Sequence, residues 1–530
     1  MNCLLKTCLV GLAGIQGVTL AAESRPKLVV GIMVVQLRPD YIENLRDMFG
    51  QGGFRRLMGN GVYITDLDFM VPGGDAASAS SIIQTGAYPR QTGISGALVY
   101  DPASMTMKSV FDDPAFIGNF TSETYSPSAL RVTTISDELA VENKDNGKIH
   151  SIAPDAAQAI VLAGHSGNSA FWINDETGRW SSTTYYSNPP VYLQNKNYNS
   201  PLISRLDTMR WTPLRNGEPY PYVSVQETAD GFRHAFSRSD RDVFNFYKLS
   251  PFVNADITDA AIEYISGLGL GKTGDRTDVL NLGYSLGAYP SSNNSSYRYE
   301  LEDAYLRLDK DLERLLDELD KQVGKDNVLI YLASTGYFVE PGVDNEKYRL
   351  PGGTFSVKRA ISLLNAYLSA KYGNGAYVTQ YADSQIFLSK QALEEKNLDP
   401  VKIAEESRDF LVRMSGVADA YTISDLSRTS MSHLEAQRRA IDPKTAGDII
   451  LDFNPGWTVV DDNRFPSVTK ENKTTYYQAP AFIMGHGISP QKIDHTVEAI
   501  AIAPTLARIM RIRPPNSAGA KPLPLLMNNK

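Results

Sequence analysis

The run Asp278-Val-Leu-Asn-Leu-Gly-Tyr is followed by a leucine-rich segment at residues 299–323 and by a second apolar run, Asn327-Val-Leu-Ile-Tyr-Leu-Ala. Leucines recur in the middle segment at helical spacing, with acidic and basic residues on the opposite face, which predicts an amphipathic helix. The two flanking runs are short and apolar, which predicts buried strands. Strand, helix and strand in this order are typical of a parallel βαβ unit. The sequence therefore predicts an α/β fold.

The residues that follow the two predicted strands lack the usual reactive side chains. In open parallel sheets, ligands and catalytic groups lie just beyond the carboxyl ends of the strands. Here those ends are Gly-Ala-Tyr-Pro-Ser at residues 287–291 and Ser-Thr-Gly at residues 334–336, without an acid, a histidine or a cysteine. The sequence thus predicts an intact scaffold from which the reaction centre is missing.

Other core segments come from both ends of the chain. Lys27-Leu-Val-Val-Gly-Ile-Met-Val-Val is a continuous apolar run, typical of a strand that is buried on both faces. Residues 479–484 have the same character, and residues 500–509 predict a closing helix. We therefore expect a central, mostly parallel sheet flanked by helices, with the inserted cap regions described next.

Two ranges with weak periodicity predict insertions that cap this sheet. Residues at about 100–275 are rich in Tyr, Asn, Ser, Pro and Trp, which predicts loops and short strands. The second insertion is expected at about residues 338–472, with helices at 357–371 and 400–414 and strands within 376–389. In the first cap, Trp172, Trp180, Tyr185 and Tyr186 are candidates for a ligand or protein surface, with ordinary packing as the alternative.

The first 22 residues have the outline of a secretory signal peptide. Lys6 precedes an apolar run at residues 8–20, and Ala21-Ala22 supplies the small residues of a cleavage site. A buried first strand or helix is the alternative. We expect that cleavage of this signal leaves a mature chain of residues 23–530, which is periplasmic or secreted. No later run approaches the roughly 20 apolar residues that a membrane span needs. Cys3 and Cys8 both lie in the signal, so the mature chain would have no thiol, while lipidation of Cys8 stays open.

Composition sets bounds on size and partners. The chain has 530 residues, of which 42% are hydrophobic, enough for two or three domains or for one large domain with insertions. Its formal net charge of -8 offers no basic field for nucleic acid or for an acidic membrane surface. Protein partners in the cell envelope are the expectation, and the oligomeric state stays open.

Several longer motifs resemble those of one family. They are Val30-Gly-Ile-Met-Val-Val-Gln-Leu-Arg-Pro-Asp-Tyr, Gly53-Phe-Arg-Arg-Leu, Thr85-Gly with Gly93-Ile, Thr133-Thr-Ile-Ser-Asp-Glu-Leu, Ala163-Gly-His-Ser-Gly-Asn-Ser-Ala-Phe-Trp, Glu302-Asp-Ala-Tyr-Leu-Arg-Leu-Asp-Lys-Asp-Leu and Ile502-Ala-Pro-Thr-Leu-Ala. With these motifs the chain resembles the alkaline phosphatase superfamily. The likeness is to its secreted bacterial branch, near the phosphate-irrepressible alkaline phosphatases and the nucleotide pyrophosphatase/phosphodiesterases. The resemblance covers essentially the whole mature chain.

The resemblance implies a two-zinc enzyme as the active form of the family. In such an enzyme a threonine or serine attacks phosphorus, and six Asp and His side chains hold the metals. Two cations about 4 Å apart lower the pKa of the nucleophile and neutralise charge on the phosphoryl oxygens. The resemblance therefore implies a zinc cofactor and a defined set of positions, each of which can be compared with this chain.

At these positions the chain holds other residue types. The six positions at which the resemblance implies metal ligands are occupied by Val35, Gly287, Ser291, Ser334, Thr335 and Gln478. The nucleophile position is occupied by Asp75 or Ala76. The three positions that should contact phosphate hold Ala97 for an asparagine, Asp155 for a lysine and Ala157 for an arginine. Since none of the metal ligands is kept, we expect no cofactor.

The remaining candidates are isolated residues or a short motif. No histidine falls at a ligand position, and surface or packing roles are expected for His150, His165, His234, His433, His486 and His495. Asp75 alone cannot hold a dication, and a turn or helix-cap role after Gly73-Gly74 is expected. The motif Gly283-Tyr-Ser-Leu-Gly fits the nucleophile elbow of serine hydrolases at Ser285, but Pro290 and a serine-rich run interrupt the helix that should follow.

The leading hypothesis is a secreted or periplasmic pseudo-phosphatase that keeps the alkaline phosphatase fold and acts as a binding or scaffolding component. The reason is selective loss, because the strand and helix patterns persist while residues that serve only chemistry are replaced. The alternatives are a metal-dependent phosphomonoesterase or phosphodiesterase with a rearranged site and a serine hydrolase that uses Ser285. Fold alone does not decide among these functions.

Overall fold

The computed structural model describes residues 25–101, 103–186, 191–215, 217–272, 274, 276–287, 289, 297–336, 338, 352–428, 434–462, 468–471 and 478–527. The predicted signal peptide at residues 1–22 lies outside the described residues, as do Pro290, Ser291 and His433. Within the described part of the chain, no helix is both long enough and apolar enough to cross a membrane.

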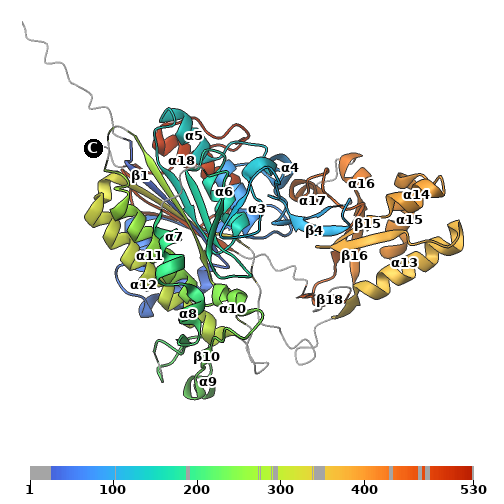
Figure 1. Ribbon diagram of the computed structural model, residues 1–530, viewed down its shortest axis with the longest axis horizontal. Helices are drawn as coiled ribbons and strands as arrows, with labels where there is room; N and C mark the ends of the chain where they lie inside the picture. Colours follow the sequence, from blue (N-terminus) through green and yellow to red (C-terminus); the bar gives the residue numbers. More distant parts are fainter. Residues whose placement is uncertain are drawn as a thin grey trace, which may run out of the picture.

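A mixed sheet of eleven strands lies at the centre of the described structure (Figure 1). In order across the sheet, its strands are β21 (Gln491–Ile493), β2 (Gly61–Asp68), β20 (Ala479–Gly485), β12 (Val328–Ser334), β1 (Leu28–Val35), β11 (Asp278–Ser285), β6 (Ile149–Ile152), β7 (Ser169–Ile173), β8 (Trp180–Thr183) and β5 (Gly118–Asn119), and β22 (Val497–Glu498) also pairs with β2. The five central strands from β12 to β7 are parallel, whereas β20 is antiparallel to β12 and β8 to β7. The predicted fold class is confirmed.

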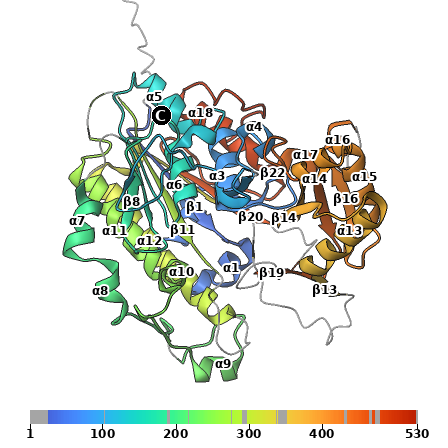
Figure 2. The ribbon, with the colours of Figure 1, turned by 45° about the vertical axis from the view of Figure 1, so that its right-hand side comes forward.

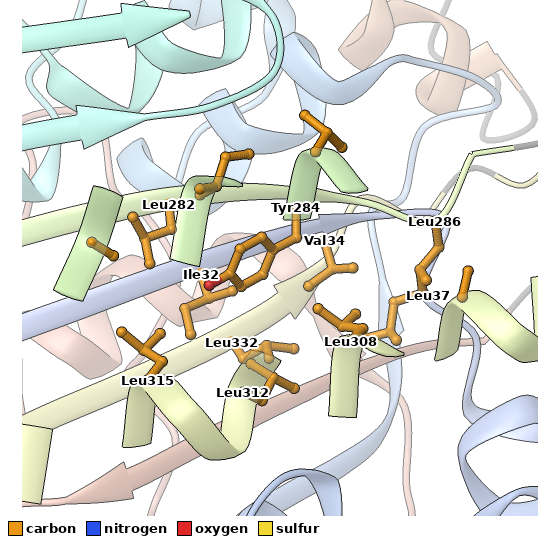
Figure 3. Close-up of a cluster of buried hydrophobic side chains, with 14 of the residues drawn as sticks. Ile32, Val34, Leu37, Leu282, Tyr284, Leu286, Leu308, Leu312, Leu315 and Leu332 are labelled. Atoms are coloured by element: carbon orange, nitrogen blue, oxygen red, sulfur yellow. The ribbon is translucent and has the colours of Figure 1, made fainter. Parts of the chain in front are cut away.

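One face of the sheet packs against a layer of helices that includes the predicted leucine-rich helix. These helices are α1 (Pro39–Asn44), α2 (Phe54–Asn60), α10 (Val243–Leu249), α11 (Phe252–Gly267) and α12 (Arg298–Gln322). Figure 3 shows Ile32 and Val34 of β1 facing Leu308 and Leu312 of α12, all in one buried cluster. The helix begins and ends within one residue of its predicted bounds.

The opposite face of the same strands is covered as well. Val29 and Met33 of β1 join a second buried cluster with residues of α3 (Ala76–Thr85), α5 (Ile135–Glu142) and α18 (Ile502–Met510). Because both faces of β1 are covered, every position along it must be apolar, which explains the continuous run in the sequence. The prediction of a buried first strand is confirmed.

The described residues between 353 and 471 form a second body beside the sheet, on the side away from α7 (Val191–Asn199) and α11 (Figures 1 and 2). It has a four-stranded sheet, a three-stranded sheet and five helices: β14 (Val378–Ala382), β15 (Gln385–Leu388), β17 (Ile449–Phe453), β16 (Val417–Thr422); β13 (Gly353–Ser356), β18 (Trp457–Asp461), β19 (Val468–Glu471); α13 (Val357–Tyr372), α14 (Lys390–Glu395), α15 (Pro400–Leu411), α16 (Ile423–Arg428) and α17 (Glu435–Ala440). Its own buried cluster includes Leu364, Ile386 and Leu451. Both helices predicted in this range are present.

The second body is joined to the first by an ion pair whose carboxylate is buried and by a ring contact. Asp442 accepts hydrogen bonds from Nη1 and Nη2 of Arg131 at 2.9 and 2.5 Å. Tyr100, on the hairpin of β3 (Leu98–Asp101) and β4 (Thr106–Ser109), packs against Phe387 of β15 at 4.5 Å between ring centroids.

The first predicted insertion, residues 100–275, differs from the structure. Strands β5, β6, β7 and β8 from this range belong to the central sheet, and α5, α6 (Ala156–Ala163) and α11 cover it. These strands are only two to five residues long and bury polar side chains such as His150, Ser151 and Ser169, so they lack the apolar run that marks β1. The elements of this range that lie outside the central sheet include α7, α8 (Leu202–Leu206), β9 (Arg210–Trp211), α9 (Val225–Asp230) and β10 (His234–Ala235).

Candidate functional site

The register of the parallel strands aligns several candidate positions at one edge of the sheet. Val35, the last residue of β1, lies opposite Ser285, the last residue of β11. Val34 lies opposite Ser334, the last residue of β12. These strand ends therefore form one edge, which is where parallel sheets place ligands and catalytic groups.

Three more candidate positions belong to the same edge. Thr335 follows β12 directly, and its backbone N–H donates to the carbonyl of Val34 at 3.1 Å. Gly287 lies two residues beyond the end of β11. Gln478 is exposed and directly precedes β20, which is antiparallel to β12, so it lies toward the carboxyl end of that strand. The structure thus places at one edge the five described positions at which the family resemblance implies metal ligands.

Asp75 caps the helix α3. It is the N-cap residue of α3, and its Oδ1 accepts a hydrogen bond from the N–H of Ser78 at 2.9 Å. Its Oδ2 accepts from the N–H of Ala97 at 2.6 Å, so both carboxylate oxygens are used. Ala76 is the first residue of the helix. The predicted capping role of Asp75 is confirmed, and the same contact explains why Ala97 lies beside it.

Asp75→Ala is expected to lower the free energy of unfolding by about 1–2 kcal/mol, because it removes the N-cap and leaves the Ala97 N–H without its acceptor. Urea unfolding followed by circular dichroism measures this change. Asp75→Asn keeps one capping oxygen and should lose less. Equal stability of the alanine variant and the wild type would contradict the capping role.

The start of α6 holds the two other positions at which the resemblance implies phosphate contacts. Ala157 is buried in one cluster with Ala77 of α3, so the first turns of the two helices pack together. Asp155 precedes the helix, and its Oδ1 lies 2.9 Å from Nζ of Lys248. Sequence reasoning missed Lys248 because 93 residues separate it from Asp155 and no local pattern links them.

The donor set at the sheet edge does not fit two zinc ions. Val35 and Gly287 have no side-chain donor. The Oγ of Ser334 donates to the carbonyl of Leu37 at 2.7 Å, and the Oγ of Thr335 accepts from the N–H of Gln36 at 3.4 Å. Zinc requires three or four His, Cys or carboxylate ligands that converge on one point. Among the residues that the structure describes, no group of three such side chains could hold a metal ion.

Apolar side chains pack closely against the backbone at Gly287 and Gly336. A β-carbon at Gly287 would overlap Cδ2 of Leu249 and lie 3.1 Å from its Cα. A β-carbon at Gly336, which directly follows Thr335 and has a φ of +73°, would lie 2.5 Å from the ring of Phe69. At these two points the neighbouring side chains leave no room for a larger residue.

Two histidines have well-defined structural partners. His150 is buried, its Nδ1 lies 2.8 Å from Oγ of Ser169, and burial lowers the pKa of its imidazole to about 3, with Lys148 acting in the same direction. Nδ1 of His165 lies 3.1 Å from Oδ2 of Asp137, and this hydrogen bond raises the pKa of His165. Both side chains therefore hold elements together away from the strand ends.

The other described histidines also lie apart from each other. Nε2 of His234 lies 2.9 Å from Oε1 of Glu300 among aromatic rings. Nδ1 of His486 lies 3.0 Å from the carbonyl of Asp326, and His495 is exposed. None of these histidines joins a group of possible metal ligands in the described chain.

Ser285 lacks the surroundings of a nucleophile elbow. Its N–H donates to Oδ1 of Asn254 at 2.9 Å, and its carbonyl accepts from Nδ2 of the same residue at 2.7 Å. The next described residues, Leu286 and Gly287, are not helical, and α12 begins only at Arg298. An elbow requires a helix that starts at the serine.

The four aromatic residues proposed as a ligand surface are mostly core residues. Trp172 of β7, Trp180 of β8 and Tyr186 are 1%, 4% and 2% exposed, and only Tyr185 is partly exposed. The Nε1–H of Trp172 donates to Glu123 at 2.8 Å. Ordinary packing of the outer strands β7 and β8 against neighbouring segments accounts for these aromatic side chains.

Comparison with known proteins agrees with this architecture. A family model described as type I phosphodiesterase / nucleotide pyrophosphatase matches residues 29–477. Alkaline phosphatase PhoV of Synechococcus elongatus is 28% identical over 521 residues, covering 94% of this chain and 92% of PhoV. Alkaline phosphatase PafA of Elizabethkingia meningoseptica is 26% identical over 530 residues, covering 95% and 94%. The crystal structure of wild-type PafA matches with a TM-score of 0.80 at 25% identity, covering 95% of this chain and 99% of that chain.

Proposed function

This chain belongs to the type I phosphodiesterase / nucleotide pyrophosphatase family and has the alkaline phosphatase fold, and on that premise we propose that it no longer transfers phosphoryl groups. In place of catalysis it serves as a binding or scaffolding component of the cell envelope. The fold and the family do not decide whether the chain catalyses a reaction, because one fold supports many functions. The residues of the candidate site must decide it.

The observation that carries the proposal is the chemistry of the residues at the strand ends. Val35, Gly287, Ser334 and Thr335 supply no carboxylate or imidazole, and the two hydroxyls are engaged by the backbone. Without cations, a hydroxyl keeps its ordinary pKa and the charge on a phosphoryl group stays unbalanced. Asp75, one of the two candidates for the nucleophile position, caps α3 with Oδ1 and accepts from the N–H of Ala97 with Oδ2.

The second candidate is a metal-dependent phosphomonoesterase or phosphodiesterase with a rearranged site. What favours it is the similarity to PhoV and PafA, both of which are named alkaline phosphatases. The two candidates differ in metal content and in turnover, so one preparation of the protein distinguishes them.

The purified mature chain is expected to contain less than stoichiometric zinc and to hydrolyse neither p-nitrophenyl phosphate nor its bis ester above the protein-free rate. Zinc is measured by inductively coupled plasma mass spectrometry and turnover by absorbance, with PafA purified in the same way as the positive control. Stoichiometric zinc together with turnover that a chelator abolishes would overturn the proposal in favour of the second candidate.

The serine-hydrolase alternative has its own test. A fluorophosphonate probe should leave the wild type unlabelled, because Ser285 is only 9% exposed and lacks an elbow. Labelling that disappears in Ser285→Ala would instead establish a reactive serine.

Export and partner binding complete the proposal. The predicted signal peptide and the net charge of -8 support a periplasmic or secreted protein that binds other proteins and not nucleic acid. Affinity purification from the native cell envelope, with an unrelated exported protein as bait control, tests this. Cofractionation of the chain with the cytoplasm would contradict export.

A further inference from the structure

The junction between α10 and α11 covers the carboxyl end of β11. Leu249, the last residue of α10, packs against Gly287 so closely that a β-carbon there would overlap its side chain. Asn254, in the first turn of α11, makes two hydrogen bonds with the backbone of Ser285, at 2.9 and 2.7 Å. Residues 248–254 therefore lie over the strand end where a ligand of this fold would bind.

The ion pairs of Lys248 connect this junction to the start of α6 and to the loop that follows β7. Nζ of Lys248 lies 2.9 Å from Oδ1 of Asp155 at the start of α6 and 2.5 Å from Oδ1 of Asp175, which lies two residues beyond β7. Lys248 itself is 7% exposed, whereas the side chains of Asp155 and Asp175 are 55% and 57% exposed. Burial opposes the charge of Lys248, but the two carboxylates outweigh it and raise the pKa of the ammonium.

The ammonium group and the two carboxylates of this cluster differ in how far they are buried. A buried ammonium depends on its counter-charges, because without them it must leave the low-dielectric interior or lose its proton. The counter-charges, in contrast, are half in solvent, where salt screens them and other ligands can reach them. Loss of the ion pairs with Asp155 and Asp175 would therefore destabilise the buried position of Lys248. It would also destabilise the packing of Leu249, the next residue in the chain.

We propose that residues 248–254 form a plug that holds the candidate site closed, and that the ion pairs of Lys248 with Asp155 and Asp175 act as its latch. The inference rests on the proposed function, since it describes how access to that non-catalytic site is controlled. Opening would uncover the ends of β11 and α6 together, because the latch joins the plug to the start of α6.

Two adjacent backbone amides report on the plug separately from the sheet. The N–H of Ser285 is protected by Asn254 of the plug, whereas the N–H of Leu286 donates to the carbonyl of Val35 in β1 at 3.0 Å. Release of the plug exposes the first amide and leaves the second in the sheet. Local and global opening are therefore distinguishable at neighbouring residues.

Residue-resolved hydrogen exchange on the full mature chain tests the latch. In the double variant Asp155→Asn/Asp175→Asn, exchange at Ser285 is expected to be about tenfold faster, while Leu286 is unchanged. Glu176→Gln, which removes a neighbouring exposed charge outside the latch, is the matched control and should behave as the wild type.

The wild type offers a second arm that needs no substitution. Raising sodium chloride to about 1 M should speed exchange at Ser285 relative to Leu286, because the half-exposed carboxylates are screened. No change at Ser285 in either arm, or equal acceleration at both amides, would overturn the plug. Zinc content and turnover are independent of this readout, so the plug and the loss of catalysis can fail separately.

Discussion

Gly287→Asp is expected to destabilise the protein by about 3 kcal/mol and to leave it without zinc. The substitution puts an aspartate at a position where the family resemblance implies a metal ligand. The space is already filled, since a β-carbon there would overlap Cδ2 of Leu249 and lie 3.1 Å from its Cα. Because the Cα belongs to the main chain, α10 must shift, and the new carboxylate would be buried without a cation.

Urea unfolding and zinc analysis of the same samples measure both parts of this prediction. Val35→Asp is the matched control, because it introduces the same side chain at a partly exposed replaced position and should cost only about 1 kcal/mol. Adding Leu249→Gly to Gly287→Asp removes the side-chain overlap and should recover part of the loss. A Gly287→Asp variant as stable as the wild type, with one zinc per chain, would show that the position is still open to a metal ligand.

Glu302→Gln is expected to stabilise the protein by about 2–3 kcal/mol at pH 8 and by almost nothing at pH 4.5. Glu302 is fully buried on α12; its Oε1 accepts from the N–H of Tyr222 at 2.8 Å, and its Oε2 has no partner among the described residues. Burial raises the pKa of its carboxyl from 4.5 to about 7, against the opposing effects of Tyr222 and Arg298.

The sign follows from which state holds the proton. Below pH 4.5 the carboxyl is protonated in both the folded and the unfolded chain, so it contributes no difference. Between about pH 4.5 and 7 the unfolded chain releases the proton while the folded chain keeps it, so stability falls as pH rises. Glutamine is neutral throughout and removes this loss.

Free energies of unfolding at several pH values between 4.5 and 8 test the prediction. Asp317→Asn, at an exposed carboxylate of the same helix, is the control and should change stability little at any pH. A Glu302→Gln variant whose advantage does not grow with pH would mean that Glu302 is ionised and solvated in the native protein.

The candidate positions could be found from the sequence because they are tied to local patterns. Val35, Ser334 and Thr335 follow apolar runs that predict strands, and strand ends in parallel sheets meet at one edge. Their register in the structure bears this out. Asp75 was similarly recognisable, because an acid after two glycines and before a helix is a typical cap.

The contacts that fill the edge could not be found in this way. Lys248 meets Asp155 across 93 residues, and Asn254 meets Ser285 across 31. Neither contact is implied by hydrophobic period, turn chemistry or motif. The short strands between residues 149 and 183 were expected in a cap and not in the central sheet for a related reason, since their short length and buried polar residues give no clear period.

The amino-acid sequence by itself determined the βαβ core and the residue types at the strand ends, because apolar period and the presence or absence of acids and imidazoles are properties of the local chain. Only the tertiary structure decided what occupies the space beside those ends. Leu249 against Gly287, Phe69 against Gly336 and Lys248 between two carboxylates are contacts between distant segments. Such contacts exist only once the sheet and its helices have packed, since burial and pairing depend on every neighbour at once.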